Sequence, residues 1–251
     1  MVEDDAGQQA WAEALAAAHE LVEHIESVVA PHMTVRSTDQ ARLFELAALA
    51  RATRLFKGMI TLCEEGSADV APVLARPIVE CWVIGHFLAL SPSEGLEVLK
   101  EDVKFQQVRM GKNGWDDLAE FSKQLEWEPK GISWKDLHNR VGELLRESHG
   151  DLAPDAIRVY DVQYRSLSFM DSHSAMGAFL GHIETGESFH RVEMKRAQPS
   201  AAPYLLLMAA HNVQNLGGRV AYDIGLSLDR FERIGSRLLE IVSKLGDQEV
   251  S

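Results

Sequence analysis

The stretch GSADVAPVLARPIVECWVIGHFLALS, residues 66–91, decides the fold of this chain. Between residues 70 and 90 the only charged or imidazole side chains are Arg76, Glu80 and His86. A helix that is apolar on nearly every side is typical of the middle of a large soluble bundle. We therefore predict a buried helix here, with His86 as a core histidine and the other helices packed around it.

The same stretch is long enough to span a bilayer, which needs about 20 predominantly apolar residues. Arg76 and Glu80 near the middle of a span would each cost roughly 2.5–3.5 kcal/mol. Pro72 and Pro77 weaken a continuous membrane helix further. We therefore expect no membrane association.

The chain has 251 residues, of which 46% are hydrophobic, and a formal net charge of -13 at pH 7. This length fits one large domain with a substantial core, so we expect a single helical domain over residues 1–251. The negative charge disfavours binding to RNA by bulk electrostatics, and binding to anionic membranes. RNA binding would need a local basic patch, and Arg51, Arg54 and Lys57 form a basic stripe on one predicted helix.

Two cysteines, Cys63 and Cys81, lie within apolar helical patterns and outside any CxxC motif. They indicate buried thiols in a reducing compartment and exclude a cysteine-based zinc site. The N-terminus is acidic and lacks the apolar segment of a secretory signal. Together with an alanine-rich composition, these features favour a cytoplasmic bacterial protein.

Apolar residues recur at helical spacing through most of the chain. No GxGxxG motif, P-loop or internal repeat is present, and no cofactor is expected. We predict an all-α fold, a single multi-helix bundle with a buried central antiparallel helix hairpin at residues 39–90. The expected helices cover residues 5–30, 39–65, 70–90, 92–111, 115–127, 133–148, 153–171, 172–183, 200–224 and 227–245.

Turn and cap signals separate these helices. Ser37 opens a capping box before the second helix, and Gly66 ends that helix. Ser133 opens a second capping box. The short helices and turns between residues 92 and 150 indicate a peripheral helical insertion, or a lid, over one end of the bundle. A loop with a short extended piece is expected at residues 184–199.

Arg76 and Glu80 are four residues apart, so they share one face of the central helix. A buried arginine without a partner is very costly, and Glu80 is the nearest candidate partner. Two interpretations follow. The pair is either a buried ion pair that fixes the register of the helix, or the floor of a polar pocket.

A second group of polar residues lies at Tyr164, Arg165, Ser168 and His173. Tyr164 and Ser168 are four apart and share a helix face. His173 joins them only if the chain kinks at residues 171–172, as the break in periodicity there suggests. An arginine, a hydroxyl and an imidazole together can bind a phosphate or carry out acid–base chemistry on RNA. The alternative is a polar network at a helix joint.

A third group, His211, Asn215, Arg219 and Asp223, forms an i,i+4 ladder on an otherwise apolar helix. Gly217 and Gly218 beside it permit close approach of another helix or of a ligand. If the ladder faces Arg76 and Glu80, the two groups make one buried polar seam. If it faces solvent, it is the hydrated side of a helix.

Two patterns in the chain carry a family resemblance. The first is Arg-x-x-Arg, a Leu before a Gly-containing turn, and Leu-x-Arg-x-x-x-Glu; the second is Tyr-x-x-x-Ser-x-x-x-x-His. The matching residues are Arg51, Arg54, Leu62, Gly66, Leu74, Arg76 and Glu80, then Tyr164, Ser168 and His173. In these patterns the chain resembles an uncharacterised bacterial all-helical family of unknown function. The resemblance implies the helical fold.

The chain also resembles the HEPN superfamily of helical bundles, which includes toxin and antiphage ribonucleases. That resemblance implies an RNA-directed effector of bacterial defence or toxicity. HEPN ribonucleases use an Arg followed by four to six residues and then a His. Here seven residues separate Arg165 from His173.

Three functions remain open, and whether the protein is an enzyme stays open with them. It is an RNA-directed, HEPN-like effector with Arg165, Ser168 and His173 as catalytic residues, a non-enzymatic interaction or scaffold protein, or a sensor of a small anionic ligand. Helical bundles of this type often form homodimers, so a homodimer is one expected partner. No metal site is expected, because no Glu-x-x-His pair lies on a predicted helix. The predicted binding residues are Arg51, Arg54, Arg76, Glu80, Tyr164, His211, Asn215 and Arg219.

Overall fold

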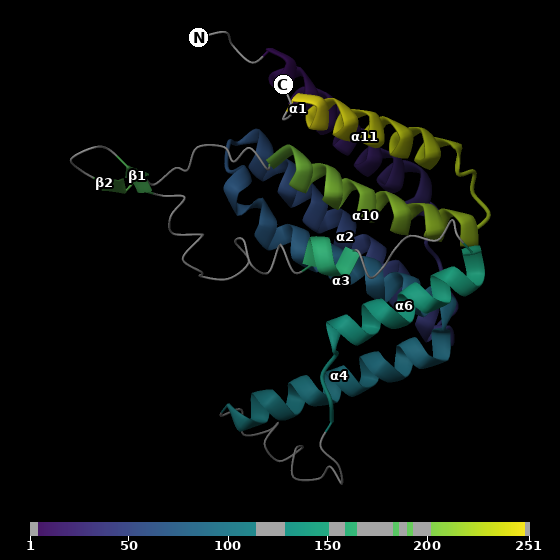
Figure 1. The fold of residues 1–251 in the computed structure, drawn as a ribbon. Helices are drawn as coiled ribbons and strands as arrows, with labels where there is room; N and C mark the ends of the chain where they lie inside the picture. The colour runs from purple at the N-terminus through teal and green to yellow at the C-terminus, as the bar shows by residue number, and fades with distance from the viewer. Residues whose placement is uncertain are drawn as a thin grey trace.

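The computed structural model describes residues 5–113, 129–150, 159–164, 183–185, 190–192 and 202–248. These residues form a helical bundle, which confirms the all-α prediction (Figure 1). The long helices are α1 (Asp5–His24), α2 (Gln40–Glu64), α3 (Ala71–Leu90), α4 (Pro92–Lys112), α6 (Trp134–His149), α10 (Ala202–Asp223) and α11 (Asp229–Gln248). The short elements are η1 (Ile25–Val29), η2 (Ala30–His32), η3 (Ala68–Val70), η5 (Val159–Tyr164), β1 (Ile183–Thr185) and β2 (His190–Val192).

Helices α2 and α3 form the predicted antiparallel hairpin and pack closely along their lengths. The turn between them is built on Gly66, whose φ of 73° is a left-handed conformation that glycine adopts at little cost. The N–H of Gly66 donates to the carbonyl of Cys63, and the N–H of Ser67 donates to that of Leu62 at 2.7 Å. Gly66 therefore ends α2 as the sequence predicts.

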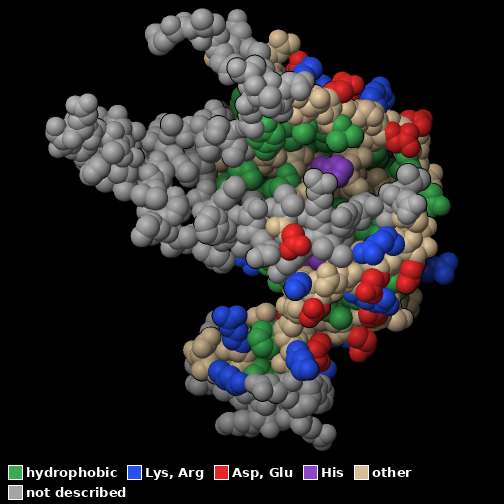
Figure 2. All heavy atoms as spheres, viewed as in Figure 1, with side chains coloured by type: hydrophobic (Ala, Val, Ile, Leu, Met, Phe, Trp, Pro, Cys, Tyr) green, Lys and Arg blue, Asp and Glu red, His purple; other side chains and the backbone are tan. Residues whose placement is uncertain are grey.

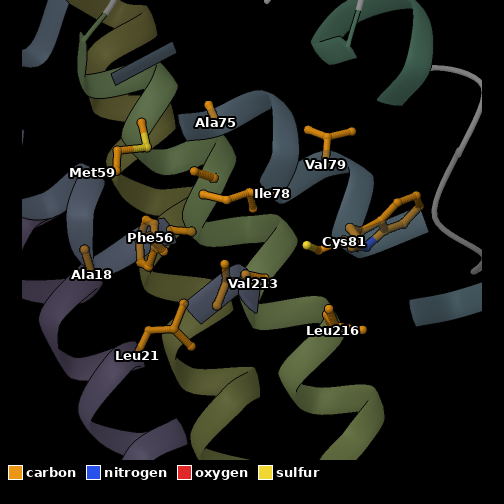
Figure 3. Close-up of a cluster of buried hydrophobic side chains, with 14 of the residues drawn as sticks. Ala18, Leu21, Phe56, Met59, Ala75, Ile78, Val79, Cys81, Val213 and Leu216 are labelled. Atoms are coloured by element: carbon orange, nitrogen blue, oxygen red, sulfur yellow. The ribbon is translucent and has the colours of Figure 1, made fainter. Parts of the chain in front are cut away.

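The core is centred on α3. Ile78 is completely buried and belongs to one cluster with Phe56 of α2, Val213 of α10 and Leu21 of α1 (Figure 3). Burial of such side chains is the main favourable contribution to folding. The stretch at residues 66–91 is therefore the centre of the core.

Helix α10 packs against the α2–α3 hairpin on one side and against α1 and α11 on the other, and α1 also contacts α2 directly (Figure 1). The close packing of α10 on α11 depends on Gly217. A Cβ atom at this position would lie 2.8 Å from the Phe231 ring and 3.3 Å from Ile25, so only glycine fits without displacing a ring. Gly218 is less crowded, because a Cβ there would make ordinary contacts at 3.7 Å.

Helices α4 and α6 lie at the lower end of the bundle in the view of Figure 1, and the C-terminal end of α6 comes close to the C-terminal end of α10. Both pack against α3, and Arg140 of α6 donates to Glu94 of α4 at 3.0 Å. On the face drawn in Figure 2, acidic and basic side chains alternate over this region, and no extended basic surface is visible among the coloured residues. The interpretation of residues 92–150 as an insertion or lid stays a prediction, and the helix expected at 115–127 lies outside the described residues.

The caps and the short elements refine the predictions. Asp39, and not Ser37, caps α2, because its Oδ1 accepts the N–H of Arg42 at 3.0 Å. Ser133 caps α6 as predicted and accepts the N–H of Asp136. The hairpin of β1 and β2 falls where an extended piece was expected. Of the helices predicted over 153–183, the structure describes only residues 159–164, which form a π-helical turn.

By length and composition alone, α3 could cross a membrane. Among all the helices that the structure describes, only α3 meets this criterion. The core helix of a soluble protein meets it too, and the buried residues of α3 pack against α2 and α10.

Candidate functional site

Arg76 and Glu80 form an ion pair on one face of α3, as their spacing predicts. The Nε of Arg76 donates to Oε1 of Glu80 at 3.3 Å. Side-chain exposure is 24% for Arg76 and 26% for Glu80. The pair is therefore partly desolvated, yet a solute can still reach it.

Tyr164 joins this pair from η5, a segment far along the chain. The Nη2 of Arg76 donates to the Tyr164 hydroxyl at 2.8 Å, and the guanidinium carbon lies 4.9 Å from the centre of the ring. The same hydroxyl donates to Oε1 of Glu80 at 3.5 Å. Two patterns that are widely separated in the sequence therefore meet in space.

Two side chains of α6 flank the Tyr164 ring. The ring centres of Trp134 and His138 both lie 5.8 Å from that of Tyr164. Trp134 and His138 are four apart, so α6 presents them on one face. Sequence reasoning missed both residues, although this spacing directly after the Ser133 cap was visible.

Glu80 has unusual electrostatics. Burial raises its pKa above the ordinary value of 4.5, and the positive charge of Arg76, the Tyr164 hydroxyl and the more distant Arg51 oppose that rise. A carboxyl group with a raised pKa is a stronger base than an exposed glutamate, and it gives up its proton closer to neutrality. Glu80 is therefore the group best suited to exchange a proton at this site.

Arg51 extends the site onto α2. Its charge lowers the pKa of Cys81, although burial dominates and raises that pKa to about 11, so the thiol stays protonated near neutral pH. Arg51 and Arg54 are both exposed, and neither forms an ion pair with a residue that the structure describes. Lys57, the third member of the predicted basic stripe, pairs with Glu26 at 2.7 Å.

Arg51, Arg76, Glu80 and Tyr164 are together called the α3 cluster. Four of the predicted binding residues are thus brought together, and Arg54 lies one turn away from Arg51 on α2. The cluster combines two guanidinium groups, a proton-exchanging carboxyl and a hydroxyl. This set of groups can bind a phosphate and transfer a proton.

A protein-family model, described as a family of unknown function (DUF5677), matches residues 44–190, which is more than half of the chain. The chain belongs to the DUF5677 family. All four residues of the α3 cluster lie inside the DUF5677 match. No curated protein and no solved structure matches the chain.

The DUF5677 match also spans the residues predicted to be catalytic. Arg165, Ser168 and His173 lie outside the described residues, so their assignment stays a prediction. Among the residues that are described, no three His, Cys, Asp or Glu side chains gather as metal ligands do.

The ladder on α10 lies beyond the DUF5677 match. The Nδ2 of Asn215 donates to the carbonyl of His211 at 3.0 Å, and the Nε of Arg219 donates to Asp223 at 3.1 Å. Within the described part of the chain, no hydrogen bond or ion pair joins this ladder to Arg76. The ladder and the α3 cluster therefore form two separate polar regions, not the single seam considered from the sequence.

His86 is a buried core histidine, as predicted. Its Nδ1 donates to the carbonyl of Trp82 at 2.9 Å. Burial lowers the pKa of His86 from 6.5 to about 4, and the charges of Arg219 and His149 act in the same direction. The imidazole is therefore neutral in the folded protein near pH 7.

This shift predicts a loss of stability in acid. Between about pH 6.5 and pH 4 the unfolded chain binds a proton at residue 86 that the folded protein does not bind. The free energy of unfolding therefore decreases by at most about 3 kcal/mol as the pH is lowered through this range. Glu80, whose pKa is raised, acts in the opposite direction, so the comparison needs a matched variant. Urea unfolding at about pH 7 and about pH 4 should show a larger loss for the wild type than for His86→Gln. Equal losses of stability in the wild type and in His86→Gln would contradict the lowered pKa of His86.

Proposed function

We propose that this DUF5677 protein is a HEPN-like effector that acts on RNA in the bacterial cytoplasm, and that the α3 cluster binds the RNA backbone. The observation that supports the proposal most is the hydrogen bond from Arg76 to Tyr164. It joins the Leu-x-Arg-x-x-x-Glu pattern to the start of the Tyr-x-x-x-Ser pattern, and the pair lies beside a carboxyl group with a raised pKa.

The groups of the cluster suit cleavage of RNA by its own 2′-hydroxyl. Glu80 takes the proton of the 2′-hydroxyl, the 2′ oxygen attacks phosphorus, and the bond from phosphorus to the 5′ oxygen breaks. The 5′ oxygen takes a proton from Tyr164, which regains one from Glu80 across their hydrogen bond. The products are a 2′,3′-cyclic phosphate and a 5′-hydroxyl. Arg76 and Arg51 stabilise the charge that builds up on the phosphoryl oxygens.

The acidic net charge is compatible with this function only if RNA binds to a local basic surface. Arg51 and Arg54 are exposed on α2 beside the cluster, and no described acidic residue pairs with either of them. Exposed arginines bind phosphate through several parallel hydrogen bonds. Binding should therefore weaken steeply as the salt concentration rises.

The exposure of the ion pair favours a site over a purely structural role. A scaffold protein should seal Arg76 and Glu80 from solvent, because then they only fix the helix register. About a quarter of each side chain is exposed instead, at 24% and 26%. This accessibility supports contact with a ligand.

Incubation of the purified protein with single-stranded and structured RNA tests the proposal. The wild type should produce fragments that end in 2′,3′-cyclic phosphate, and Glu80→Gln should still bind RNA but not cleave it. Glu94→Gln is the matched control, since Glu94 also pairs with an arginine but lies on α4. Intact RNA with the wild type, or equal loss in both variants, would reject the function.

A further inference from the structure

A cavity of about 670 Å³ lies where α3, α6 and α10 meet near the ladder. Pockets of about 300–1,000 Å³ are the size that holds small organic ligands. The polar residues that line the cavity between α3, α6 and α10 are His86, Ser148, His149, Asn215, Arg219 and Tyr222. None of these residues belongs to the α3 cluster.

Arg219 provides the positive charge of the cavity. Its Nε is occupied by Asp223 at 3.1 Å, and no described residue accepts a hydrogen bond from either terminal nitrogen. Asp223 also accepts a hydrogen bond from Arg42 at 3.1 Å, while Arg42 pairs in addition with Glu45. The Arg219 side chain as a whole is 22% exposed, and its forked end has no described hydrogen-bond acceptor, so this end is available to an anionic group.

His86 of α3 provides a hydrogen-bond acceptor on the wall of the cavity that faces α10. A carbonyl oxygen can only accept, so the contact with Trp82 requires that Nδ1 of His86 carries the hydrogen. In the neutral ring, Nε2 then has a lone pair and accepts a hydrogen bond. Nδ1 of His149 contacts the carbonyl of Leu145 at 3.3 Å in the same way. The two imidazoles that line the cavity therefore suit a ligand that brings hydroxyl groups.

We infer that this cavity binds a small hydroxylated organic anion, of the sugar-phosphate or sugar-acid class. The anionic group binds the terminal nitrogens of Arg219, and ligand hydroxyls donate to His86 and His149. Ser148 and Asn215 complete the polar lining. The inference does not depend on the RNA-directed function, because none of the residues that line the cavity belongs to the α3 cluster.

Thermal unfolding of the full chain with three probes tests the inference. Ribose 5-phosphate and gluconate carry both the charge and the hydroxyls, and ribose carries the hydroxyls alone. A ligand that binds only the folded state raises the unfolding midpoint. The two anions should raise the midpoint by several degrees at saturating concentration, and uncharged ribose should not.

Two matched variants locate the effect. In Arg219→Gln, Asp223 keeps its bond to Arg42, so the fold should persist while the shift disappears. In Arg237→Gln, Glu20 likewise keeps a second arginine, Arg230 at 2.9 Å, and the shift should remain.

Two results would overturn the inference. One is that neither anion raises the midpoint more than ribose does, and the other is an unchanged shift in Arg219→Gln. Arg76→Gln, which should impair the RNA function, should keep the full shift. A failure of this inference can therefore be told apart from a failure of the proposed function.

Discussion

Truncating Ile78 to alanine should lower the free energy of unfolding by about 2–5 kcal/mol. Ile78 has 0% exposure and lies at the centre of α3, between α2 and α10. The lost methylene and methyl groups leave a cavity that closely packed helices cannot fully close. Urea unfolding measures the change directly.

Val73→Ala is the control for Ile78→Ala, since it lies on the same helix but is 46% exposed. A surface substitution of this kind should change the free energy of unfolding by no more than about 0.5 kcal/mol. Similar losses for the two variants would mean that α3 is not buried on the face that contains Ile78.

Arg76→Gln should reduce the rate of RNA cleavage by roughly 100- to 1,000-fold, the usual effect of removing one group that stabilises transition-state charge. The substitution removes the positive charge that the proposed mechanism places against the phosphoryl group, together with the hydrogen bond from Arg76 to Tyr164. Cleavage of labelled RNA under single-turnover conditions measures the rate.

Arg140→Gln is the control for Arg76→Gln, because it also removes an arginine–glutamate pair, here between α6 and α4. Its cleavage rate should stay close to that of the wild type. A comparable loss in both variants, or cleavage by Arg76→Gln at the wild-type rate, would remove Arg76 from the site.

The central hairpin could be predicted because its signals are local. An uninterrupted apolar stretch and Gly66 determine where α2 ends and where α3 is buried. The cap of α2 was assigned wrongly because Ser37 and Asp39 are both good capping residues, and the choice depends on where the helical backbone begins. Helix ends are generally uncertain by one or two residues for this reason.

The Arg76–Glu80 pair could be predicted from its spacing alone. The packing of Trp134 and His138 on Tyr164 could not, since helical periodicity does not say which helices meet. The same limit applies to α10: the spacing predicts the ladder, but not that Arg219 lines a cavity away from Arg76. The local sequence determines which residues share one face of a helix, whereas the whole fold determines which other helix that face contacts.

Direct coupling between Arg76 and Tyr164 holds the α3 cluster together, and a double-mutant cycle with Arg76→Gln and Tyr164→Phe measures this coupling. Tyr164→Phe keeps the ring but removes the hydroxyl that accepts the 2.8 Å hydrogen bond from Arg76. Residues in direct contact usually show coupling energies of about 0.5–3 kcal/mol in the free energy of unfolding. We predict coupling of about 1 kcal/mol or more in urea unfolding. Losses that simply add would contradict the contact.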